Sequence, residues 1–393
     1  MKICILSSFE DLLLKDTGPS IRIYNLAKGL ASLGNEVHVI IPKDKMTSEY
    51  IDGMTVHGIK GLCPIVILKV LCKLLGVSRS TSLFFYDLLF ISRANRIIRE
   101  SDMVQIEQQS AGGLLIPIIT RILKKPLVVD CHDVFQALRV KHTSIIRRIL
   151  ETFLEKMAYK YTDVILTVSE REKECLVSYG IGQRNIEVIP NGVDTEAFNN
   201  LLDVEHVQDR YGLKDFRTVI FVGNIKYLPN QEAVQLIASE LAPKVQKEIN
   251  STKFLIVGRT PAKMELPNLT FTGVVENVAE LLAASDVAIA PLFHGSGTRL
   301  KILEYFSCGL PVVSTTVGVE GLDVMNGVHV LTEDDMNEFA IKVTKLLKDK
   351  ASSTRLGKAA RELVVNRYDW KKIARRLDAV YHVLLVRMVT KRM

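Results

Sequence analysis

The segment 293–315, FHGSGTRLKILEYFSCGLPVVST, combines glycines, cations and one carboxylate in a spacing that suits a phosphate-containing ligand. Gly295 and Gly297 lie in a loop that leads directly into helix-forming residues, and the helix is predicted to begin near Thr298. The first N–H groups of a helix have no partner within it, and the helix dipole adds partial positive charge there. Glycines allow the backbone to approach a ligand without an intervening Cβ. The loop and the helix start therefore indicate a phosphate site.

Two cations and one carboxylate follow in the same helix. Arg299 and Lys301 fall in its first turn, where the helix dipole disfavours positive charge, so an anion in front of them explains them better than helix stability does. Glu304 follows about two turns in, and a carboxylate suits paired hydroxyls such as those of ribose. Together these residues describe a nucleotide-diphosphate site. The alternative is a loop in which the glycines only turn the chain and both cations are solvated.

The composition is that of a globular protein with two domains of ordinary size. The chain has 393 residues, of which 48% are hydrophobic and 24% are charged. The excess of 51 Lys and Arg over 44 Asp and Glu suits an anionic ligand or an anionic membrane surface, and it is too small to indicate nucleic-acid binding. The cysteines are scattered without a C-x-x-C pair, which favours free thiols in a reducing cytoplasm and argues against a structural zinc site.

The strands and helices that must position these residues alternate along the chain. Short runs rich in β-branched residues recur between residues 2 and 190 and again between 218 and 331, with helical stretches between them. One such helix covers 20–34, with Ser20 predicted as its N-cap and Gly34 as the glycine beyond its end. The alternation predicts an α/β fold of two doubly wound, Rossmann-like domains, each built on a parallel sheet.

A polar stretch rich in turn signals, PNGVDTEAFNNLLDVEHVQDRYGLKD, separates the two sets of strands. We therefore predict a first domain over 1–197 and a second over 198–368. The two would face each other across a cleft between the carboxyl ends of their sheets, where such folds bind ligands. The terminal stretch 369–393 reads as an amphipathic, basic helix.

The apolar and basic segment 61–100 of the first domain allows two interpretations. Its most hydrophobic part, GLCPIVILKVLCKLLGV, is interrupted by Pro64, Lys69 and Lys73, and it does not make a spanning helix of about 20 apolar residues. The segment is either a set of core helices or an element that lies on a membrane surface. The N-terminal MKICILS reads as a first strand and not as a secretory signal, so we expect a cytoplasmic protein, with peripheral membrane contact as an open alternative.

The run PLFHGSGTRLKILEYFSCGLPVVST resembles the signature of GT-B glycosyltransferases in the large retaining family called glycosyltransferase family 4, or group 1. Glu304 and the Gly-x-Pro-Val-Val sequence that begins at Gly309 match the end of that signature. Further stretches resemble family landmarks, in the family's order and over nearly the whole chain: DTGPSIRIYNLAKGLASLGNEVHVI, VVDCHD, TVSEREKECLVSYG, VIPNGVDTEAF and FVGNIKYLPN. Any one of these matches is weak, whereas the ordered set is specific.

The resemblance implies transfer of a sugar from a nucleotide-diphosphate sugar to a glycan or lipid-linked acceptor, with retention of the anomeric configuration. It implies a role in polysaccharide or glycolipid biosynthesis, with the donor bound by the second domain and the acceptor by the first. It also implies that the final helix, 369–393, returns to the first domain. The sequence contains no Asp-x-Asp, in agreement with a leaving group stabilised without a metal or another cofactor.

The resemblance assigns roles to the residues of the opening segment. The backbone at Gly297 and Thr298, together with Arg299 and Lys301, would stabilise the leaving diphosphate as the glycosidic bond breaks. Glu304 would hold the ribose hydroxyls.

Further residues complete the implied site. His132, at the strand end in VVDCHD, would face the sugar from the first domain. Gly18 and Arg22 would lie near the phosphates or the acceptor. Gly223 and Lys226 belong to the loop that opens the second domain on the donor side.

The chain departs from the family pattern at three places. Ser296 stands where the family commonly has a first glutamate, so the identity of the donor sugar stays open. Asn224 replaces an arginine in the loop that opens the second domain, and Pro229-Asn230 replaces a Lys-Gly pair that usually contacts the diphosphate.

Another cation must compensate for the lost Lys-Gly pair, either Lys226 or the pair Arg299 and Lys301, and we favour the pair. The departures also keep two other functions open. One is another GT-B nucleotide-sugar enzyme, such as a 2-epimerase. The other is a non-catalytic, nucleotide-sugar-binding partner subunit.

Overall fold

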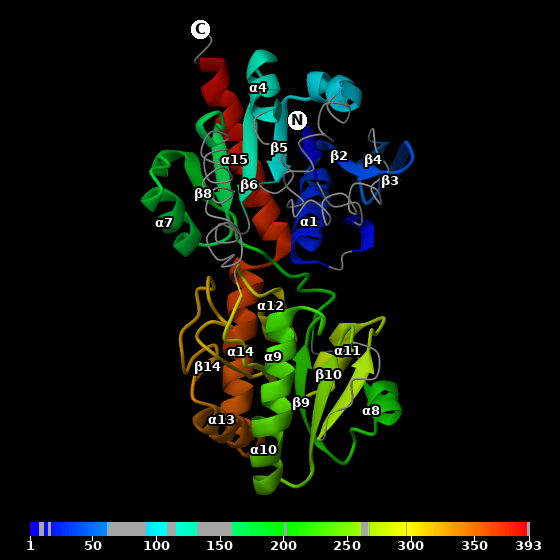
Figure 1. Ribbon diagram of the computed structural model, residues 1–393, viewed down its shortest axis with the longest axis vertical. Coiled ribbons are helices and arrows are strands. Elements are labelled where there is room, and N and C mark those ends of the chain that lie inside the picture. Colours follow the sequence, from blue (N-terminus) through cyan, green and yellow to red (C-terminus); the bar gives the residue numbers. More distant parts are fainter. Residues whose placement is uncertain are drawn as a thin grey trace, which may run out of the picture. The chain divides into compact units, whose positions relative to one another are not determined.

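The computed structural model of the chain describes residues 1–7, 12–14, 17–60, 92–107, 115–131, 159–199, 203–260, 266, 268–295 and 297–390. The chain forms two compact units (Figure 1): unit 1 comprises Met1–Pro190 and Lys371–Met393, and unit 2 comprises Asn191–Trp370. Each is built on a sheet that is mostly or wholly parallel, which confirms the predicted α/β class. The predicted site residues His132 and Ser296, and 61–91 of the apolar and basic segment, lie outside the described residues.

Unit 1 contains an eight-stranded sheet in the order β3-β4-β2-β1-β5-β6-β7-β8. Every neighbouring pair is parallel except β3 and β4, which form a hairpin around Asp52 and Gly53, two residues with positive φ. Asp-Gly favours this kind of two-residue turn. The strands are β1 Lys2–Leu6, β2 Glu36–Lys43, β3 Thr47–Ile51, β4 Met54–Lys60, β5 Met103–Glu107, β6 Leu127–Cys131, β7 Val164–Thr167 and β8 Ile186–Val188.

The helices of unit 1 include α1 Gly18–Ser32, α4 Leu115–Ile122, α7 Glu170–Ser178 and α15 Trp370–Thr390, together with a helix over 92–100. The predicted N-cap of α1 is wrong, because Thr17 and not Ser20 caps the helix. The Thr17 and Ser20 side chains each accept a hydrogen bond from the other residue's backbone N–H, which makes a capping box. Gly34 has φ of 86°, and its N–H donates to the Ala31 carbonyl, so the predicted glycine beyond the helix end is confirmed.

The long helix α15 packs its apolar side on unit 1. Ile373, Leu377 and Leu384 are buried, and the buried Tyr381 hydroxyl donates to the side-chain carbonyl of Gln105 in β5. These contacts join the last helix of the chain to the central strands of the first sheet. Among the described residues, no helix is both long enough and apolar enough to cross a membrane.

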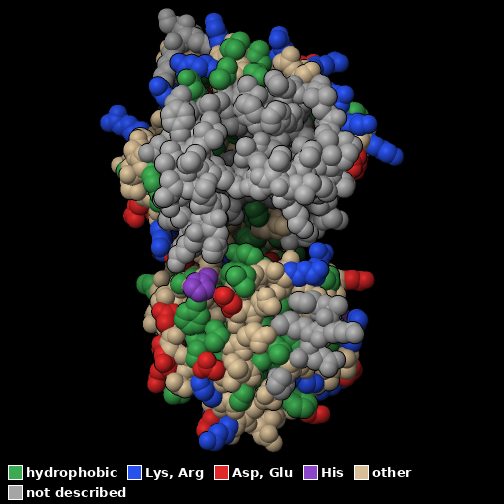
Figure 2. Space-filling view, in the orientation of Figure 1, with side chains coloured by type: hydrophobic (Ala, Val, Ile, Leu, Met, Phe, Trp, Pro, Cys, Tyr) green, Lys and Arg blue, Asp and Glu red, His purple; other side chains and the backbone are tan. Residues whose placement is uncertain are grey.

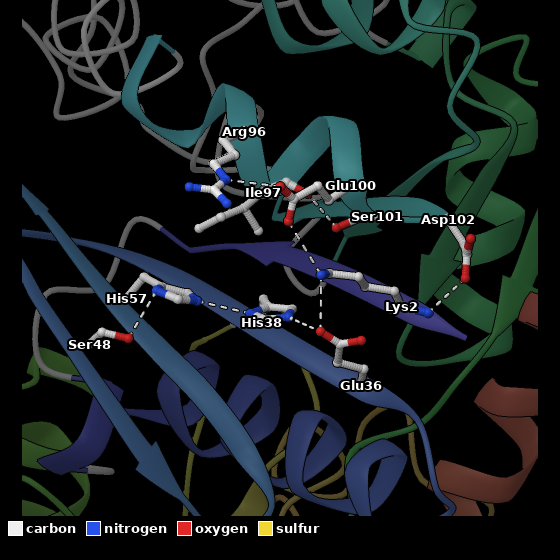
Figure 3. A network of polar contacts seen from close by, with 10 residues as sticks. All are labelled: Lys2, Glu36, His38, Ser48, His57, Arg96, Ile97, Glu100, Ser101 and Asp102. Carbon is white, nitrogen blue, oxygen red and sulfur yellow. Dashed lines mark hydrogen bonds and ion pairs between the residues drawn. The ribbon is translucent and has the colours of Figure 1, made fainter.

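Polar contacts join the amino ends of the central strands of unit 1 (Figure 3). Lys2, which begins β1, lies 3.0 Å from Glu36 of β2 and 3.5 Å from Glu100. Glu36 also lies 2.9 Å from Nε2 of His38, and Nδ1 of His38 lies 2.9 Å from Nε2 of His57 in β4. Burial, followed by the charges of His38 and Lys2, lowers the pKa of His57. This network holds the strand starts together, whereas the candidate site residues follow the strand ends.

Unit 2 contains a six-stranded, wholly parallel sheet in the order β11-β10-β9-β12-β13-β14. Its strands are β9 Arg217–Val222, β10 Thr252–Val257, β11 Leu269–Gly273, β12 Val287–Ala290, β13 Val312–Ser314 and β14 Leu331–Thr332. Its helices include α8 Glu205–Tyr211, α9 Leu228–Leu236, α10 Ala242–Glu248, α11 Val278–Ala283, α12 Leu300–Ser307, α13 Met336–Lys348 and α14 Lys350–Arg367. The order runs outward from β9 in both directions, so right-handed connections place the helices of the two halves on opposite faces.

The core of unit 2 fixes the orientation of α12. Phe221 of β9 and the α12 residues Ile302 and Phe306 are fully buried in one apolar cluster. Full burial of such a side chain stabilises the fold by about 1.5–3 kcal/mol relative to exposure. Lys301 and Glu304 lie on the less buried side of the same helix.

Side chains of different kinds are distributed differently over the two units on the face shown in Figure 2. Lys and Arg stand out along the margin of unit 1, whereas unit 2 mixes cations, anions and apolar side chains. The formal net charge of +7 is therefore not concentrated over unit 2 on this face.

Candidate functional site

The candidate residues of unit 2 gather at the carboxyl ends of β9 and β12. The strand order reverses between these two neighbours, and parallel α/β sheets bind ligands in the crevice outside such a point. Gly223 directly follows β9, and the loop 291–299 leads from β12 into α12. A Cβ added to Gly223 would lie 2.9 Å from Nζ of Lys301. The fold thus brings together two motifs that are far apart in the sequence.

Helix α12 begins at Leu300, two residues later than predicted, and this places its cations differently. Arg299 occupies the N-cap position with φ of −86°, and Lys301 lies in the first turn. The helix ends in a Schellman motif: the N–H of Gly309 donates to Phe306, and that of Leu310 donates to Tyr305. Gly309 has φ of 68°, which explains the glycine of the Gly-x-Pro sequence.

The glycine loop before α12 makes room for Arg299. Gly295 and Gly297 have φ of 129° and 67°, conformations that favour glycine. A Cβ on Gly295 would lie 2.8 Å from Nη2 of Arg299, and Nη1 of Arg299 donates to the Gly297 carbonyl. The sequence predicts that the missing Cβ admits a ligand, whereas the structure places the arginine's own guanidinium there. Arg299 is therefore folded over the loop that it follows.

The Thr298 side chain is hydrogen-bonded to a residue of unit 2 that is far from it in the sequence. Its buried Oγ1 accepts a hydrogen bond of 2.7 Å from Nδ2 of Asn191. Asn191 begins unit 2, and sequence reasoning treated Asn191-Gly192 only as a turn. No local pattern marks Asn191 as a partner of the phosphate loop, because the contact depends on the fold.

Lys301 has two neighbours that sequence reasoning missed. Its Nζ donates to Oδ1 of Asn230 in α9 at 2.8 Å, and it lies 4.1 Å from the centroid of the Phe221 ring. Nδ2 of Asn230 donates to the Asn224 carbonyl at 2.9 Å. Both asparagines are positions at which the chain departs from the family pattern. Asn230, which belongs to the replaced Lys-Gly pair, is therefore the hydrogen-bond partner of Lys301, one of the cations predicted to compensate for that pair.

Lys301 and Glu304 both have pKa values shifted towards neutrality. Burial raises the pKa of Glu304 to about 7, with the charge of Lys301 opposing the shift. Burial, followed by the charge of Arg299, lowers the pKa of Lys301 to about 7, with Glu304 opposing. An anion bound beside Lys301 would favour its charged form. Titratable groups with such shifts at a ligand-binding edge are typical of functional sites.

Helix α12 is tied directly to the end of β9. The Tyr305 hydroxyl, fully buried, accepts a hydrogen bond of 2.8 Å from the backbone N–H of Val222. Burial raises the pKa of Tyr305 far above its usual range, so the phenol stays protonated. This contact fixes the position of α12 along β9, the strand that Gly223 follows.

The loop after β9 is held against the loop after β10. A Cβ on Gly258, whose φ is 128°, would overlap the Gly223 carbonyl oxygen. The backbone N–H of Ile225 donates to the Arg259 carbonyl at 2.9 Å, and that of Lys226 donates to Oδ1 of Asn224 at 3.1 Å. The Lys226 side chain is exposed at the surface of this loop.

Arg22 does not present its guanidinium to a ligand in this structure. It is fully buried, with Nε 2.8 Å from Oδ2 of Asp130 and Nη2 2.9 Å from Oδ1, and Nη1 donates to the Pro190 carbonyl at 3.0 Å. A buried guanidinium requires an opposite charge, and Asp130 near the end of β6 supplies it. A place for Arg22 near the phosphates or the acceptor stays a prediction. Gly18 is exposed as the first residue of α1.

Unit 1 has an equivalent reversal of strand order between β1 and β5. Ser7 follows β1 and Glu107 ends β5; both are buried, and Ser7 Oγ lies 3.5 Å from Oε2 of Glu107. Sequence reasoning missed Glu107, although a carboxylate that closes the apolar run DMVQIE is a detectable signal. Elsewhere in the described part of the chain, no group of three or more His, Cys, Asp and Glu is arranged to hold a metal ion.

Two family models match most of the chain. Residues 17–197 match the model described as Glycosyltransferase Family 4, and residues 216–349 match the model described as Glycosyl transferases group 1. Among curated relatives, N-acetyl-alpha-D-glucosaminyl L-malate synthase of Bacillus anthracis is 25% identical over 57% of this chain and 66% of its own length. The Escherichia coli UDP-Gal:alpha-D-GlcNAc-diphosphoundecaprenol alpha-1,3-galactosyltransferase is 25% identical over 72% of this chain and 75% of its own.

Solved structures share the fold of the whole chain. Sucrose-phosphate synthase from Thermosynechococcus elongatus superposes with a TM-score of 0.76 at 18% identity, covering 98% of this chain and 100% of that one. Anabaena HepE in complex with UDP superposes with a TM-score of 0.72 at 16% identity, with the same coverage of 98% and 100%. At such identities the likeness establishes the fold alone.

The family models agree with the ordered motifs, and the solved structures agree with the two parallel-sheet units. These matches favour neither an epimerase nor a non-catalytic binder. The chain therefore belongs to the group 1 glycosyltransferases of family 4, and it is a glycosyltransferase of the GT-B fold.

Proposed function

We propose that the protein transfers a sugar from a nucleotide-diphosphate sugar to a glycan or lipid-linked acceptor, with retention of anomeric configuration and without a metal or other cofactor. The observation that carries this proposal is the convergence of Arg299, Lys301 and Glu304 where the strand order of unit 2 reverses. Unit 2, which corresponds to the predicted donor domain 198–368, would bind the nucleotide. Unit 1, which corresponds to 1–197 and the last helix, would bind the acceptor.

The transfer step places negative charge on the leaving group. The bond between the anomeric carbon and the diphosphate oxygen breaks, and its electron pair stays on that oxygen. The acceptor oxygen bonds to the anomeric carbon on the same face, and its proton passes to the departing phosphate oxygen. Cations and N–H groups aimed at this charge lower the barrier. We assign this role to Arg299, Lys301 and the backbone at Gly297 and Thr298.

The remaining predicted residues have more limited roles in the proposal. Glu304 in its ionised form would accept hydrogen bonds from the ribose hydroxyls. Ser296 would bond a hydroxyl of the donor sugar, and His132 would face that sugar from unit 1. Gly18 would lie near the phosphates or the acceptor, and Gly223 would line the donor loop.

Two basic residues are assigned by their surroundings. Lys226 is exposed on the loop after β9 and is the second candidate for a diphosphate contact. Arg22 would act indirectly, because its pairing with Asp130 fixes the strand that precedes His132.

The acceptor class is supported by the name of a relative. The name of the Escherichia coli relative gives a diphosphoundecaprenol-linked sugar as its acceptor. We infer a lipid-linked or glycan acceptor and a cytoplasmic protein, with 61–100 in peripheral contact with an anionic membrane surface. Sedimentation with phosphatidylglycerol-containing vesicles tests the membrane part: binding should weaken as salt screens the basic residues. Equal binding to neutral vesicles would contradict it.

A thermal-shift panel of UDP, GDP, ADP and their sugar conjugates tests the donor site. A ligand that binds only the folded protein raises its melting temperature, so one nucleotide series should stabilise the parent and fail to stabilise Glu304→Ala. Equal stabilisation of both proteins by the same nucleotide series would contradict the assignment of Glu304 to the nucleotide site.

Activity measurements test the mechanism separately. Turnover should be unchanged by EDTA, and NMR of the product should show the same anomeric configuration as the donor. Loss of turnover with EDTA, or an inverted product, would contradict the metal-independent or the retaining part of the proposal.

A further inference from the structure

We propose that Asn230 is a positioning residue for the transfer reaction: its side-chain amide holds the Lys301 ammonium at Gly223, where the ammonium can reach the donor diphosphate with its charge intact. This inference rests on the proposed function, because it assumes a diphosphate at the carboxyl ends of β9 and β12. It assigns a role to an uncharged residue at a position where the chain departs from the family pattern.

The Asn230 amide is fixed on both sides. Oδ1 accepts from Lys301 Nζ at 2.8 Å, and Nδ2 donates to the Asn224 carbonyl at 2.9 Å. An ammonium can only donate and a carbonyl can only accept, so these partners set which way the amide points. Asn230 is 8% exposed, and its backbone N–H donates to the Tyr227 carbonyl at 3.0 Å. The side-chain amide therefore has little freedom to turn away.

The surroundings of Lys301 leave part of its hydrogen-bonding capacity for a ligand. Asn230 takes one of its three N–H donors, and the Phe221 ring, 4.1 Å from Nζ to its centroid, covers another side of the ammonium. Gly223 has no side chain, and a Cβ there would lie 2.9 Å from Nζ. Contacts from β9, α9 and the loop between them thus orient the ammonium, and its remaining N–H is the one that the proposal assigns to the ligand.

A neutral partner suits an ammonium that must bind an anion. A carboxylate at position 230 would neutralise Lys301, as Asp130 neutralises Arg22 in unit 1. The amide holds the ammonium without cancelling its charge. The other charges that face Lys301 come from its own helix and its N-cap: Arg299 lowers the pKa of Lys301, and Glu304 raises it.

The competing explanation is that Asn230 only stabilises the loop 223–227. Its bond to Asn224 would serve that purpose without any role for Lys301. The two explanations differ in what they predict for diphosphate binding when Lys301 is already absent.

Isothermal titration with UDP, GDP and ADP, and NMR titration with the matching nucleosides, separate them. Asn230→Ala should weaken binding of the preferred nucleoside diphosphate about tenfold, as expected for a lost hydrogen bond to a charged group. Asn230→Asp should weaken it further. Nucleoside binding should be unchanged in both. Gln231→Ala is the matched control, because Gln231 is an exposed amide at the next position of the same helix.

A double-mutant cycle with Lys301→Ala gives the decisive readout. In the Lys301→Ala background, Asn230→Ala should have no further effect on diphosphate affinity. Loss of the acceptor should also shift the alkaline fall in diphosphate affinity of Asn230→Ala to lower pH, because the ammonium is then less stabilised. Equal additional loss in both backgrounds, or an unshifted pH profile, would overturn the inference.

The outcome also separates this inference from the proposed function. A parent protein that binds none of the three diphosphates would contradict both the proposed function and the role of Asn230. A parent that binds one of them, with a folded Asn230→Ala variant that binds it equally well, overturns only the role of Asn230.

Discussion

The two sheets of this glycosyltransferase have the same kind of strand-order reversal, but their cations are used in opposite ways. In unit 1, Arg22 is fully buried and paired with Asp130. In unit 2, Lys301 is held by the neutral amide of Asn230 and is partly exposed. Asp130 neutralises Arg22, whereas the amide of Asn230 adds no opposite charge beside Lys301, and we propose that this leaves the ammonium for the donor diphosphate.

The polar groups at the strand-order reversals of the two units also differ in their chemistry. Ser7 after β1 and Glu107 at the end of β5 are a buried hydroxyl and a buried carboxylate. Lys301 and Arg299 after β12 offer positive charge, which suits a diphosphate. A shared fold therefore leaves the chemistry to the few side chains at the strand ends.

The largest effect should follow from breaking the buried pair of unit 1. Arg22→Ala leaves Asp130 buried without its counter-charge, and removal of one partner of such a pair costs about 3–5 kcal/mol. Urea unfolding followed by circular dichroism should show this loss for unit 1. Arg375→Ala, at an exposed position of α15, is the control and should change stability by less than about 0.5 kcal/mol. A stable Arg22→Ala protein that has lost diphosphate binding would instead support a ligand role for Arg22.

Lys301→Ala should have the next largest effect, and it should act on catalysis. Loss of one donor that stabilises the leaving group lowers kcat by about 100- to 1,000-fold. Initial rates with the donor identified by thermal shift measure this directly. Lys226→Ala supplies the comparison within the same unit and should lower kcat by less than tenfold, about what a screened surface charge contributes. Equal losses would show that Lys226 contributes as much as Lys301, and a larger loss for Lys226→Ala would show that the loop after β9 and not α12 compensates for the missing Lys-Gly pair.

The pH dependence of nucleotide binding should be smaller and should have two limbs. Because the pKa of Glu304 is raised to about 7, the carboxylate becomes protonated and loses acceptors as pH falls below that value. Because the pKa of Lys301 is lowered to about 7, the ammonium loses its charge as pH rises above it. Diphosphate affinity measured by calorimetry from pH 5 to 9 should therefore peak near neutrality. Glu304→Gln should remove only the acidic limb; an unchanged profile would separate Glu304 from nucleotide binding.

The smallest effect should come from the amino edge of unit 1, where His57 lies beside His38. The pKa of His57 is lowered in the folded state, so below the unfolded value of about 6.5 the unfolded chain binds more protons. The resulting stability is present above that pH and is lost as pH falls. Because His57 is partly exposed, the loss should be at most about 1 kcal/mol. Urea unfolding at pH 5 and 7.5 should show a smaller difference for His57→Gln, and an equal difference would exclude His57 as its source.

Much of the fold follows from local patterns in the sequence. The apolar runs TVIFVGN, KFLIVG and DVAIAP overlap β9, β10 and β12, because buried parallel strands favour continuous runs of apolar and β-branched residues. Helix ends were less certain: Thr17 replaced Ser20 as the cap of α1, and α12 begins two residues after Thr298. Several side chains compete for a cap within one turn, and the tertiary packing of the helix selects among them.

The sequence marked the candidate site residues but not the side chains that hold them. Lys301 of the segment 293–315 lies beside Gly223 at the carboxyl ends of β9 and β12, and the ligand roles of the segment stay a prediction. Asn191, Asn230 and Glu107 were missed as parts of a site. Their contacts join residues that are far apart in the chain, so no local pattern predicts these partners.

The sequence by itself determined the parallel α/β units, the glycines at positive φ and the kinds of charged residue in the site. These follow from local propensity, hydrophobic spacing and residue chemistry. The tertiary structure alone decided which cation meets a carboxylate and which meets a neutral amide. Arg22 meets Asp130 across 108 positions of the chain, and Lys301 meets Asn230 across 71. The strand order sets these meetings, because it determines which strand ends and helices lie side by side.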